Sequence, residues 1–271
     1  MAFDVAGGAY GRFMGRFSEP LAEPFADFAG VFPASALRVL DVGCGPGALT
    51  ALLVERLGSD SVCGVDPSEP FVAAVRERLP GVDIRQAPAE DLPYGSAQFH
   101  AALAQLVVHF MADPRRGVGE MARVTAAGGV VAACVWDHGG GQGPLSLFWR
   151  AASELDPDVL DESGRPGAQE GELGSLLTAV GLEDVVETAL TVTSAFSSFD
   201  EWWAPYTLGV GPAGDHVGRL DPSGRTALRE RCRELLPDPP FTVHASAWAA
   251  RGVKAGAART EAHHARRSPA R

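Results

Sequence analysis

A glycine-rich stretch near residue 43 is the part of this sequence whose residue types and spacing best suit ligand chemistry. The run VLDVGCGPGALT occupies residues 39–50 and has glycine at every second position from 43 to 47. Four strand-forming residues precede the glycines, and helix-like sequence follows them. Glycine lets a backbone approach a ligand closely, and N–H groups at a helix N-terminus are free to bind it. The stretch therefore predicts a small-molecule site between a strand and a helix.

Two ligand classes are bound by a strand, a glycine turn and a helix arranged in this way. Dinucleotides are recognised by Gly-x-Gly-x-x-Gly/Ala, a pattern that Gly43, Gly45 and Ala48 satisfy. Three features favour another ligand: the additional Gly47, Asp41 just before the loop, and the 36-residue segment ahead of the strand. A carboxylate at that position suits a ligand with an ammonium group. S-adenosylmethionine has that group and no phosphate.

At these residues the chain resembles the class I S-adenosylmethionine-dependent methyltransferases, specifically the small-molecule branch of the ubiquinone and menaquinone methyltransferase type. The likeness covers residues 10–136 well and the remainder loosely. LDVGCGPG matches the family's first motif. VCGVDPS matches the second, with Asp66 where the family's acidic residue binds two ribose hydroxyls. The resemblance implies S-adenosylmethionine as cofactor and S-adenosylhomocysteine as product.

Further motifs carry the same resemblance. QAPAEDLPY is similar to the third motif, beside the adenine, and LAQLVVHF to the fourth, beneath the transferable methyl. AYGRFMGRF resembles an N-terminal element that closes over the cofactor. ARVTAAGG resembles a helix-to-strand turn in which Ala126 and Ala127 replace the family's Lys-Pro. The cofactor-binding residues that the resemblance implies are Tyr10, Arg16, Asp41, Gly43, Cys44, Gly45, Gly47, Asp66, Pro67, Ala89, Glu90, Asp91 and Gln105.

Each of these assignments has a structural alternative. Asp41 could simply cap the loop, and Asp66 could cap the helix that follows it. Glu90 and Asp91 could be solvated loop charges. The element around Arg16 could be an amphipathic lid that only packs on the sheet. The sequence leaves both interpretations open at every one of these positions.

His109 is the candidate catalytic residue. Methyl transfer from a sulfonium is a direct displacement, so the protein must chiefly align nucleophile, carbon and sulfur. We expect no metal, and a base is needed only for an acceptor that is protonated at neutral pH. His109 follows the strand whose end faces the methyl, so it could act as base, as orienting group or as a packing residue. His100 sits at the opposite end of that strand and should be remote.

Aromatic residues are numerous around the predicted mouth of the site. Some could shape an acceptor pocket, and one above the sulfonium would add cation–π attraction. Aromatic residues at helical spacing most often pack in a core instead. The candidate substrate-pocket residues are Trp136, His138, Trp149, Trp202, Trp203 and Tyr206.

The elements that must position these residues alternate between strand and helix from residue 37 onward. Such alternation implies right-handed βαβ units and an open parallel sheet covered by helices on both faces. We therefore expect an α/β, Rossmann-like doubly wound fold. Its sheet is mostly parallel and seven-stranded, with a terminal antiparallel strand pair, an N-terminal helical lid and a helical cap insertion. Strands are expected at 37–42, 61–66, 82–87, 98–104, 129–136, 182–195 and 241–253.

We expect a single methyltransferase domain over residues 1–253 and a disordered basic tail at 254–271. Within the domain, the lid occupies 10–36, the cofactor-binding core 37–136 and the cap 197–238. Residues 144–168 show mixed character and no clear element. Helices are expected near 115–125, at 171–180 and, as a pair, within 199–236.

Composition limits the function classes. The formal charge is −11, and the tail carries five Lys or Arg against the single Glu261, which leaves −15 on the remainder. A body this acidic repels a phosphate backbone, so we expect no nucleic-acid partner. No apolar run approaches the length of a membrane span, and the four cysteines form no Cys-x-x-Cys pair. We expect a cytoplasmic protein with reduced cysteines and no membrane partner.

The sequence thus predicts an enzyme that transfers a methyl group from S-adenosylmethionine to a small-molecule acceptor without a metal. One alternative keeps the fold without turnover, as a cofactor-binding sensor or scaffold subunit. A more remote alternative is an NAD-dependent oxidoreductase. The acceptor, the methylated atom and the oligomeric state stay open.

Overall fold

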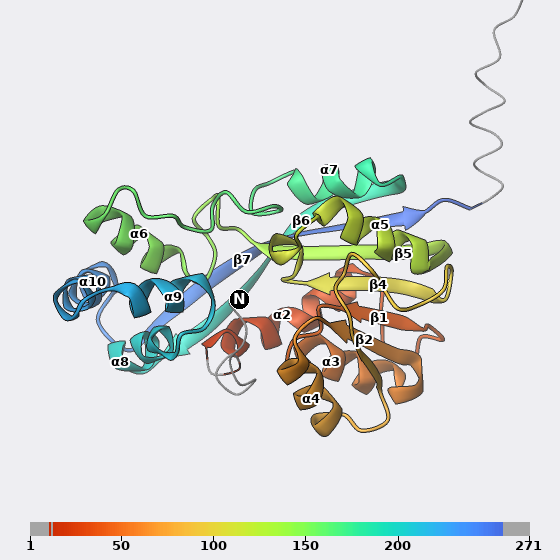
Figure 1. Ribbon diagram of the computed structural model, residues 1–271, viewed down its shortest axis with the longest axis horizontal. Coiled ribbons are helices and arrows are strands. Elements are labelled where there is room, and N and C mark those ends of the chain that lie inside the picture. Colours follow the sequence, from red (N-terminus) through yellow and green to blue (C-terminus); the bar gives the residue numbers. More distant parts are fainter. Residues whose placement is uncertain (1–10, 12, 257–271) are drawn as a thin grey trace, which may run out of the picture.

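The computed structural model of the protein describes residues 11 and 13–256, and its centre is a seven-stranded sheet (Figure 1). The strand order is β3-β2-β1-β4-β5-β7-β6. The neighbouring strands β3, β2, β1, β4 and β5 pair in parallel, whereas β7 runs antiparallel to both β5 and β6. The predicted fold class is confirmed. The strands are β1 (Val39–Val42), β2 (Val62–Asp66), β3 (Asp83–Gln86), β4 (Phe99–Gln105), β5 (Thr125–Trp136), β6 (Leu182–Phe196) and β7 (Phe241–Lys254).

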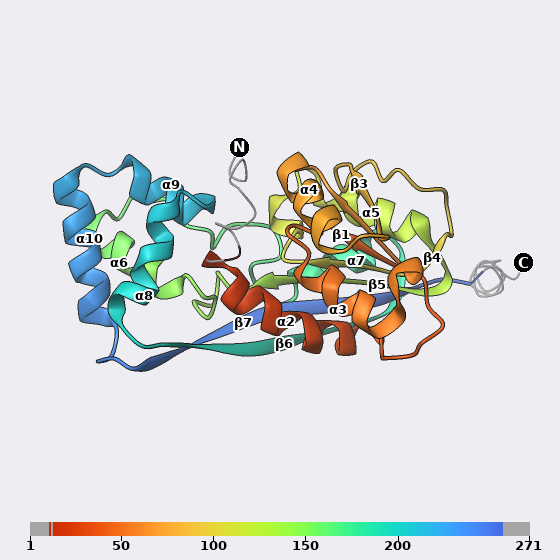
Figure 2. The same ribbon diagram turned by 90° about the horizontal axis from the view of Figure 1, so that it is seen from below.

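Helices cover both faces of the sheet (Figures 1 and 2). One face packs against α2, α3 and α4, and the other against α5 and α7. Among the described residues no helix is long and apolar enough to cross a membrane. The α-helices are α2 (Gly15–Phe28), α3 (Ala48–Leu57), α4 (Glu69–Arg78), α5 (Pro114–Val124), α6 (Ser146–Leu155), α7 (Glu172–Ala179), α8 (Phe199–Trp203), α9 (Gly211–Arg219) and α10 (Pro222–Leu235).

Side-chain alternation along the strands divides the core into two halves. In β4, Ala101 and Leu103 pack on the α2 and α3 side, whereas Ala102 and Ala104 pack on the α5 and α7 side. Strands buried on both faces are continuously apolar, as expected of a covered parallel sheet. The period of two also places Gln105 on the α2 side, where it meets that helix.

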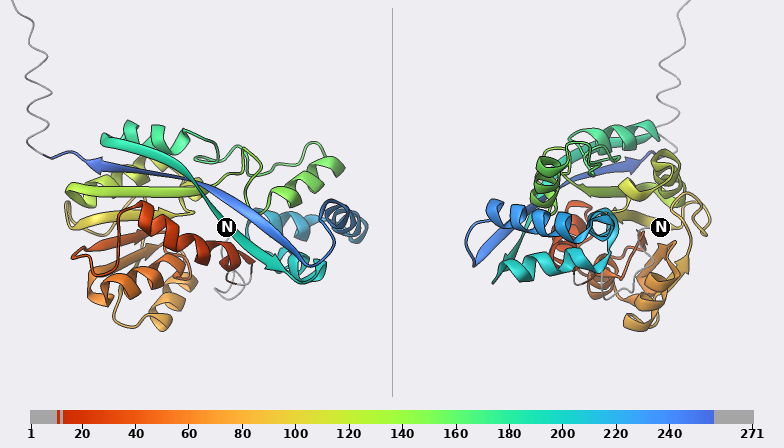
Figure 3. Two further views of the ribbon diagram at one scale, coloured as in Figure 1. Left: turned by 180° about the vertical axis from the view of Figure 1, so that it is seen from behind. Right: turned by 60° about the vertical axis from the view of Figure 1, so that its left-hand side comes forward.

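The antiparallel pair β6 and β7 extends past the other strands and carries a group of helices at its far end (Figures 2 and 3). The helices α8, α9 and α10 lie between these two strands in the chain, and α6 packs against α10. Arg231 of α10 pairs with Glu154 of α6 at 2.5 Å. The rings of Phe148 and Tyr206 stack with centroids 4.6 Å apart. We call α6 and α8–α10 the cap helices.

The structure differs from the sequence prediction in three elements. Helix α6 occupies part of the segment expected to be irregular, and three α-helices, not two, follow β6. Strand β5 begins at Thr125, four residues early, because the turn at Gly128 is accommodated as a register shift against β4. All four cysteines are free and buried. The structure describes the tail only as far as residue 256.

Candidate functional site

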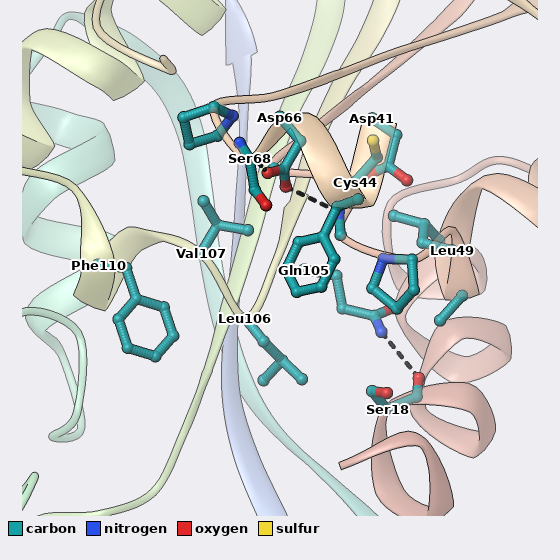
Figure 4. A pocket seen from close by; sticks show the side chains of 16 residues that line it. Ser18, Asp41, Cys44, Leu49, Asp66, Ser68, Gln105, Leu106, Val107 and Phe110 are labelled. Atoms are coloured by element: carbon teal, nitrogen blue, oxygen red, sulfur yellow. Dashed lines mark hydrogen bonds between the residues drawn. The ribbon is translucent and has the colours of Figure 1, made fainter. Parts of the chain in front are cut away.

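A pocket of about 740 Å³ opens beyond the carboxyl ends of β1, β2 and β4 (Figure 4). Strands β1 and β4 are neighbours, although β2 and β3 lie between them in sequence, so the strand order reverses here. Ligands of open α/β sheets bind at such a point. The residues lining this first pocket are Ser18, Asp41, Gly43, Cys44, Gly45, Pro46, Ala48, Leu49, Asp66, Pro67, Ser68, Phe71, Gln105, Leu106, Val107 and Phe110.

The glycine loop forms the floor of this pocket. Gly43, Gly45 and Gly47 have φ of +70°, +52° and +90°, in the left-handed region where a side chain is unfavourable. A Cβ on Gly43 would lie 2.4 Å from Val107 Cγ2, whereas one on Gly45 would meet no atom of the described residues within 4 Å. Gly43 is therefore required for packing against the loop after β4, and Gly45 leaves open space beside the pocket.

Asp66 holds the glycine loop in place. Its Oδ2 accepts a hydrogen bond from Gly45 N at 2.9 Å, and its Oδ1 accepts one from Ser68 N at 2.8 Å. The residue is 6% exposed. Burial raises the pKa of this carboxyl, and the two backbone N–H groups oppose that rise. Each oxygen retains acceptor capacity for a ligand hydroxyl.

Asp41 lies deeper, at the end of β1. Its Oδ2 accepts a hydrogen bond from Thr50 Oγ1 at 2.6 Å, which links the strand to α3. Burial raises the pKa of Asp41 to about 7, the Thr50 bond opposes that shift, and the nearby Asp66 charge adds to it. Near neutral pH this carboxyl is poised between its two forms. A cationic ligand group close by would favour the ionised form.

Several buried polar atoms of the first pocket lack a hydrogen-bond partner among the described residues. They are Ser18 Oγ, Ser68 Oγ and Gln105 Oε1. Gln105 Nε2 donates to the Ser18 carbonyl at 2.8 Å, which fixes the amide between β4 and α2. Buried polar groups are normally paired. Unpartnered atoms around a pocket are what a polar ligand would satisfy, so these residues fit a ligand with several hydrogen-bonding groups.

The structure brings together seven of the predicted cofactor residues. Two others lie elsewhere: Gly47 caps α3 and faces Val75, and Arg16 pairs with Glu201 of α8. Tyr10 lies outside the described residues. The seven that line the first pocket are Asp41, Gly43, Cys44, Gly45, Asp66, Pro67 and Gln105.

The predicted adenine-side residues Ala89, Glu90 and Asp91 do not line the first pocket. Ala89 is buried in the core beside α5, and Asp91 is exposed. Glu90 Oε1 accepts hydrogen bonds from Ala112 N at 2.8 Å and Asp113 N at 3.2 Å, so it joins two loops.

Some residues of the first pocket carry no sequence signal of their own. Ser18 comes from α2, far away in the sequence. Leu106 and Val107 directly follow the predicted Gln105, and this adjacency is the signal that could have found them. Leu106 has a φ of +62°, unusual for a residue with a side chain.

A second pocket of about 420 Å³ shares Leu106 and Phe110 with the first. The polar members of its wall are His109, His138, Glu162 and Trp136, whose Nε1 is buried without a partner. Every other described side chain in the wall is apolar. The lining residues are Phe13, Met14, Leu106, His109, Phe110, Trp136, His138, Leu145, Glu162, Val210, Gly211, Pro212 and Ala213.

His109 and His138 face each other in this second pocket, with ring centroids 6.0 Å apart. His109 lies in the 3-10 helix η2 (Val108–Phe110), and His138 follows β5. Burial lowers the pKa of His109 well below its ordinary value and that of His138 to about 4. Charge repulsion from Arg165 adds to both shifts. Both rings are therefore neutral at pH 7.

The remaining aromatic candidates are part of the cap helices or support them. Trp149 Nε1 donates to Glu162 Oε2 at 3.1 Å, behind the second pocket. Trp202, Trp203 and Tyr206 are buried together, with Trp202 and Tyr206 ring centroids 4.8 Å apart. Neither pocket is lined by these four aromatic residues.

Comparison with known proteins gives consistent matches. The family described as a methyltransferase domain matches residues 40–133. An uncharacterized methyltransferase of Mycobacterium sp. (strain JLS) is 30% identical over 209 residues, which cover 73% of this chain and 81% of that protein. Another, from Mycobacterium tuberculosis (strain ATCC 25618 / H37Rv), is 40% identical over 129 residues, covering 48% of this chain and 49% of that protein. The chain thus spans about half the length of the first relatives that it matches.

A solved structure shares the fold. Geranyl diphosphate C-methyltransferase from Streptomyces coelicolor A3(2), in complex with Mg²⁺, geranyl diphosphate and S-adenosyl-L-homocysteine, aligns with a TM-score of 0.52 and 16% identity. The alignment covers 88% of this chain and 80% of that one. At this identity the likeness concerns the fold alone.

Replacement of Gly43 and of Gly45 by alanine should lower the stability of the protein by different amounts. Gly43→Ala should lower the free energy of unfolding by roughly 2 to 5 kcal/mol, because left-handed strain and overpacking against Val107 add together. Gly45→Ala should cost about 1 to 2 kcal/mol, from strain alone, and should weaken S-adenosylhomocysteine binding. Urea denaturation and calorimetry measure the two effects. Equal losses of stability would contradict this packing argument.

The raised pKa of Asp41 should make the stability difference between wild type and Asp41→Asn depend on pH. Because its pKa of about 7 lies above the ordinary 3.8, ionisation destabilises the folded state. That penalty is absent below pH 3.8, grows as pH rises toward 7 and is constant above it. Asp41→Asn keeps an acceptor for Thr50 and removes the penalty.

The stability of Asp41→Asn relative to wild type should therefore be greater at pH 8 than at pH 5, by about 2.5 kcal/mol. Denaturant unfolding at both pH values measures this difference. A difference that does not change with pH would show that Asp41 titrates normally.

Proposed function

The chain belongs to the S-adenosylmethionine-dependent methyltransferases, and we propose that it transfers a methyl group to a small molecule held in the second pocket. The observation that carries this proposal is the pair of adjoining pockets. One is built on the glycine loop and Asp66, and the other is mostly apolar. The cofactor supplies a methyl group activated on a sulfonium sulfur. The protein binds two molecules and aligns them.

We propose that the first pocket holds the cofactor. Asp66 would accept hydrogen bonds from ribose hydroxyls while it keeps its bonds to the loop. Asp41, poised near pH 7, would ionise opposite the ammonium group. The unpartnered oxygens of Ser18, Ser68 and Gln105 would be satisfied by the remaining polar groups.

The acceptor would occupy the second pocket. Its apolar wall favours an acceptor with an aromatic or aliphatic body, such as those of the ubiquinone and menaquinone methyltransferase type. The shared residues Leu106 and Phe110 lie where the two ligands would meet. Holding two reactants in register can lower a barrier by roughly 7 to 11 kcal/mol. Alignment by these walls would be the main catalytic contribution.

His109 would be one of the polar groups that contact the acceptor, and Trp136 and His138 would complete that wall. The neutral state of His109 is compatible with contact to an acceptor hydrogen. In this arrangement Trp149 would act indirectly, through Glu162. The aromatic group of Trp202, Trp203 and Tyr206 would hold the cap helices rigid behind the pocket.

Turnover tests the proposal directly. The full chain is incubated with S-adenosylmethionine and a panel of phenols, quinols, thiols and amines, and release of S-adenosylhomocysteine is measured. We expect release with at least one class. His109→Ala should lower kcat about 10²- to 10⁴-fold and leave cofactor affinity unchanged.

The matched control is His100→Ala, at the opposite, exposed end of β4. This variant should keep wild-type kcat. Equal kcat for His109→Ala and wild type would remove His109 from the acceptor site. Cofactor binding without release from any acceptor class would favour a sensor or scaffold.

A further inference from the structure

Three side chains able to bind a metal meet in the wall of the second pocket. His109 lies in η2, His138 follows β5, and Glu162 lies between α6 and α7. Each offers one ligand atom, and the three atoms lie within 4.8 Å of one another. The residues are 5%, 8% and 3% exposed. Three separate segments thus place two imidazoles and a carboxylate at one buried point.

Three of the four ring nitrogens of these histidines lack partners within the described part of the chain. Both ring nitrogens of His138, and Nδ1 of His109, are buried there without a hydrogen bond. Leaving such atoms unpaired typically costs about 1 to 3 kcal/mol each. A packing histidine would be expected to bond at least one nitrogen to the protein. Unsatisfied imidazole nitrogens beside a carboxylate point to a cation as their partner.

We propose that His109, His138 and Glu162 bind a divalent transition-metal ion, such as zinc, whose open position holds a hydroxyl or thiol group of the acceptor. Two imidazoles and one carboxylate are a known ligand set for catalytic zinc and for non-haem iron. Three protein ligands leave room for an exogenous ligand. The acceptor part of this inference rests on the proposed function, whereas the metal site does not.

Neighbouring contacts fix the ligands in position. Trp149 Nε1 donates to Glu162 Oε2, which orients the carboxylate as outer hydrogen bonds do in metal sites. Arg165 donates to the His109 carbonyl at 3.2 Å and anchors the Glu162 loop on η2. Its Nε lies 3.8 Å from Glu162 Oε1, so the carboxylate divides its charge between the guanidinium and the ion. We therefore expect moderate affinity.

The site is reachable from two sides. His138 and Glu162 also line a hollow of about 520 Å³ next to α6, together with Asp161 and Arg150. An ion could enter from this side, which is lined by polar residues, while the acceptor enters through the apolar second pocket. Two separate access paths would let the ion remain bound while acceptors exchange.

The chemistry of such an ion selects the acceptor class. A bound divalent ion can lower the pKa of a water molecule on it to about 7. When an alcohol, phenol or thiol binds, its O–H or S–H bond breaks, the proton passes to water, and the electron pair stays on the oxygen or sulfur. His109 then serves as a metal ligand and not as a base. This proposal departs from the expectation of a metal-free site.

Metal binding by the full chain tests this inference. After dialysis against a chelator, Zn²⁺ is titrated by calorimetry, and Co²⁺ is added to record its visible absorption. We expect one ion per chain and a cobalt spectrum typical of nitrogen and oxygen ligation. His138→Ala and Glu162→Gln should each weaken Zn²⁺ binding by at least about tenfold.

Two exposed residues provide matched controls. His244→Ala in β7 and Glu170→Gln in the loop before α7 should bind Zn²⁺ as wild type does. Glu162→Gln keeps an oxygen for Trp149, so its fold should be preserved even if His138→Ala proves unstable. Circular dichroism checks the fold of each variant.

Wild-type Zn²⁺ affinity no higher than that of a folded Glu162→Gln variant would overturn the metal site. S-adenosylhomocysteine titration of the same samples separates the two proposals. Zinc binding without S-adenosylhomocysteine binding would support the metal site while counting against the proposed methyl transfer.

Discussion

The carboxylate of Asp66 is the interaction on which the binding site depends. It receives N–H groups from the loop after β1 and from the loop after β2, and so joins the two segments that form the pocket floor. Burying this carboxyl costs free energy that the two N–H groups partly offset. The left-handed conformations of Gly43 and Gly45 shape the loop that delivers one of these donors. If this loop could deform, the pocket would lose both its floor and the backbone that the floor exposes.

Helix α2 and the residues after β4 are placed so that two adjoining pockets form in place of a single one. Gln105 donates a hydrogen bond to the Ser18 carbonyl and holds α2 against the sheet, so this helix forms one side of the first pocket. Met14, just before α2, lines the second pocket. Leu106, with its positive φ, stands between them, and its N–H donates to Cys134 O at 2.9 Å. Strained backbone conformations of this kind occur preferentially at ligand sites. Alignment of two ligands therefore depends on one short segment.

Local signals in the sequence were sufficient to predict the sheet and the glycine loop, because strand alternation and glycine spacing are patterns that extend over only a few residues. Helix α6 was missed because its segment is flanked by glycine, proline and acidic residues. The grouping of His109, His138 and Glu162 depends on three loops far apart in sequence, and no spacing motif marks it. Arg16 suited an anionic ligand by type, yet in the fold it pairs with Glu201. Tertiary packing decides with which group such a charged side chain pairs.

Calorimetric titration of S-adenosylhomocysteine into the wild-type chain, Asp66→Ala and Asp60→Ala tests the central claim most directly. The two aspartates flank opposite ends of β2, and Asp60 is exposed, so the second variant controls for loss of a charge. The account predicts one binding site per chain, unchanged affinity in Asp60→Ala and at least about a tenfold loss in Asp66→Ala, since hydrogen bonds to a charged group contribute roughly 1.5 to 3 kcal/mol. Wild-type affinity in a folded Asp66→Ala variant would contradict it.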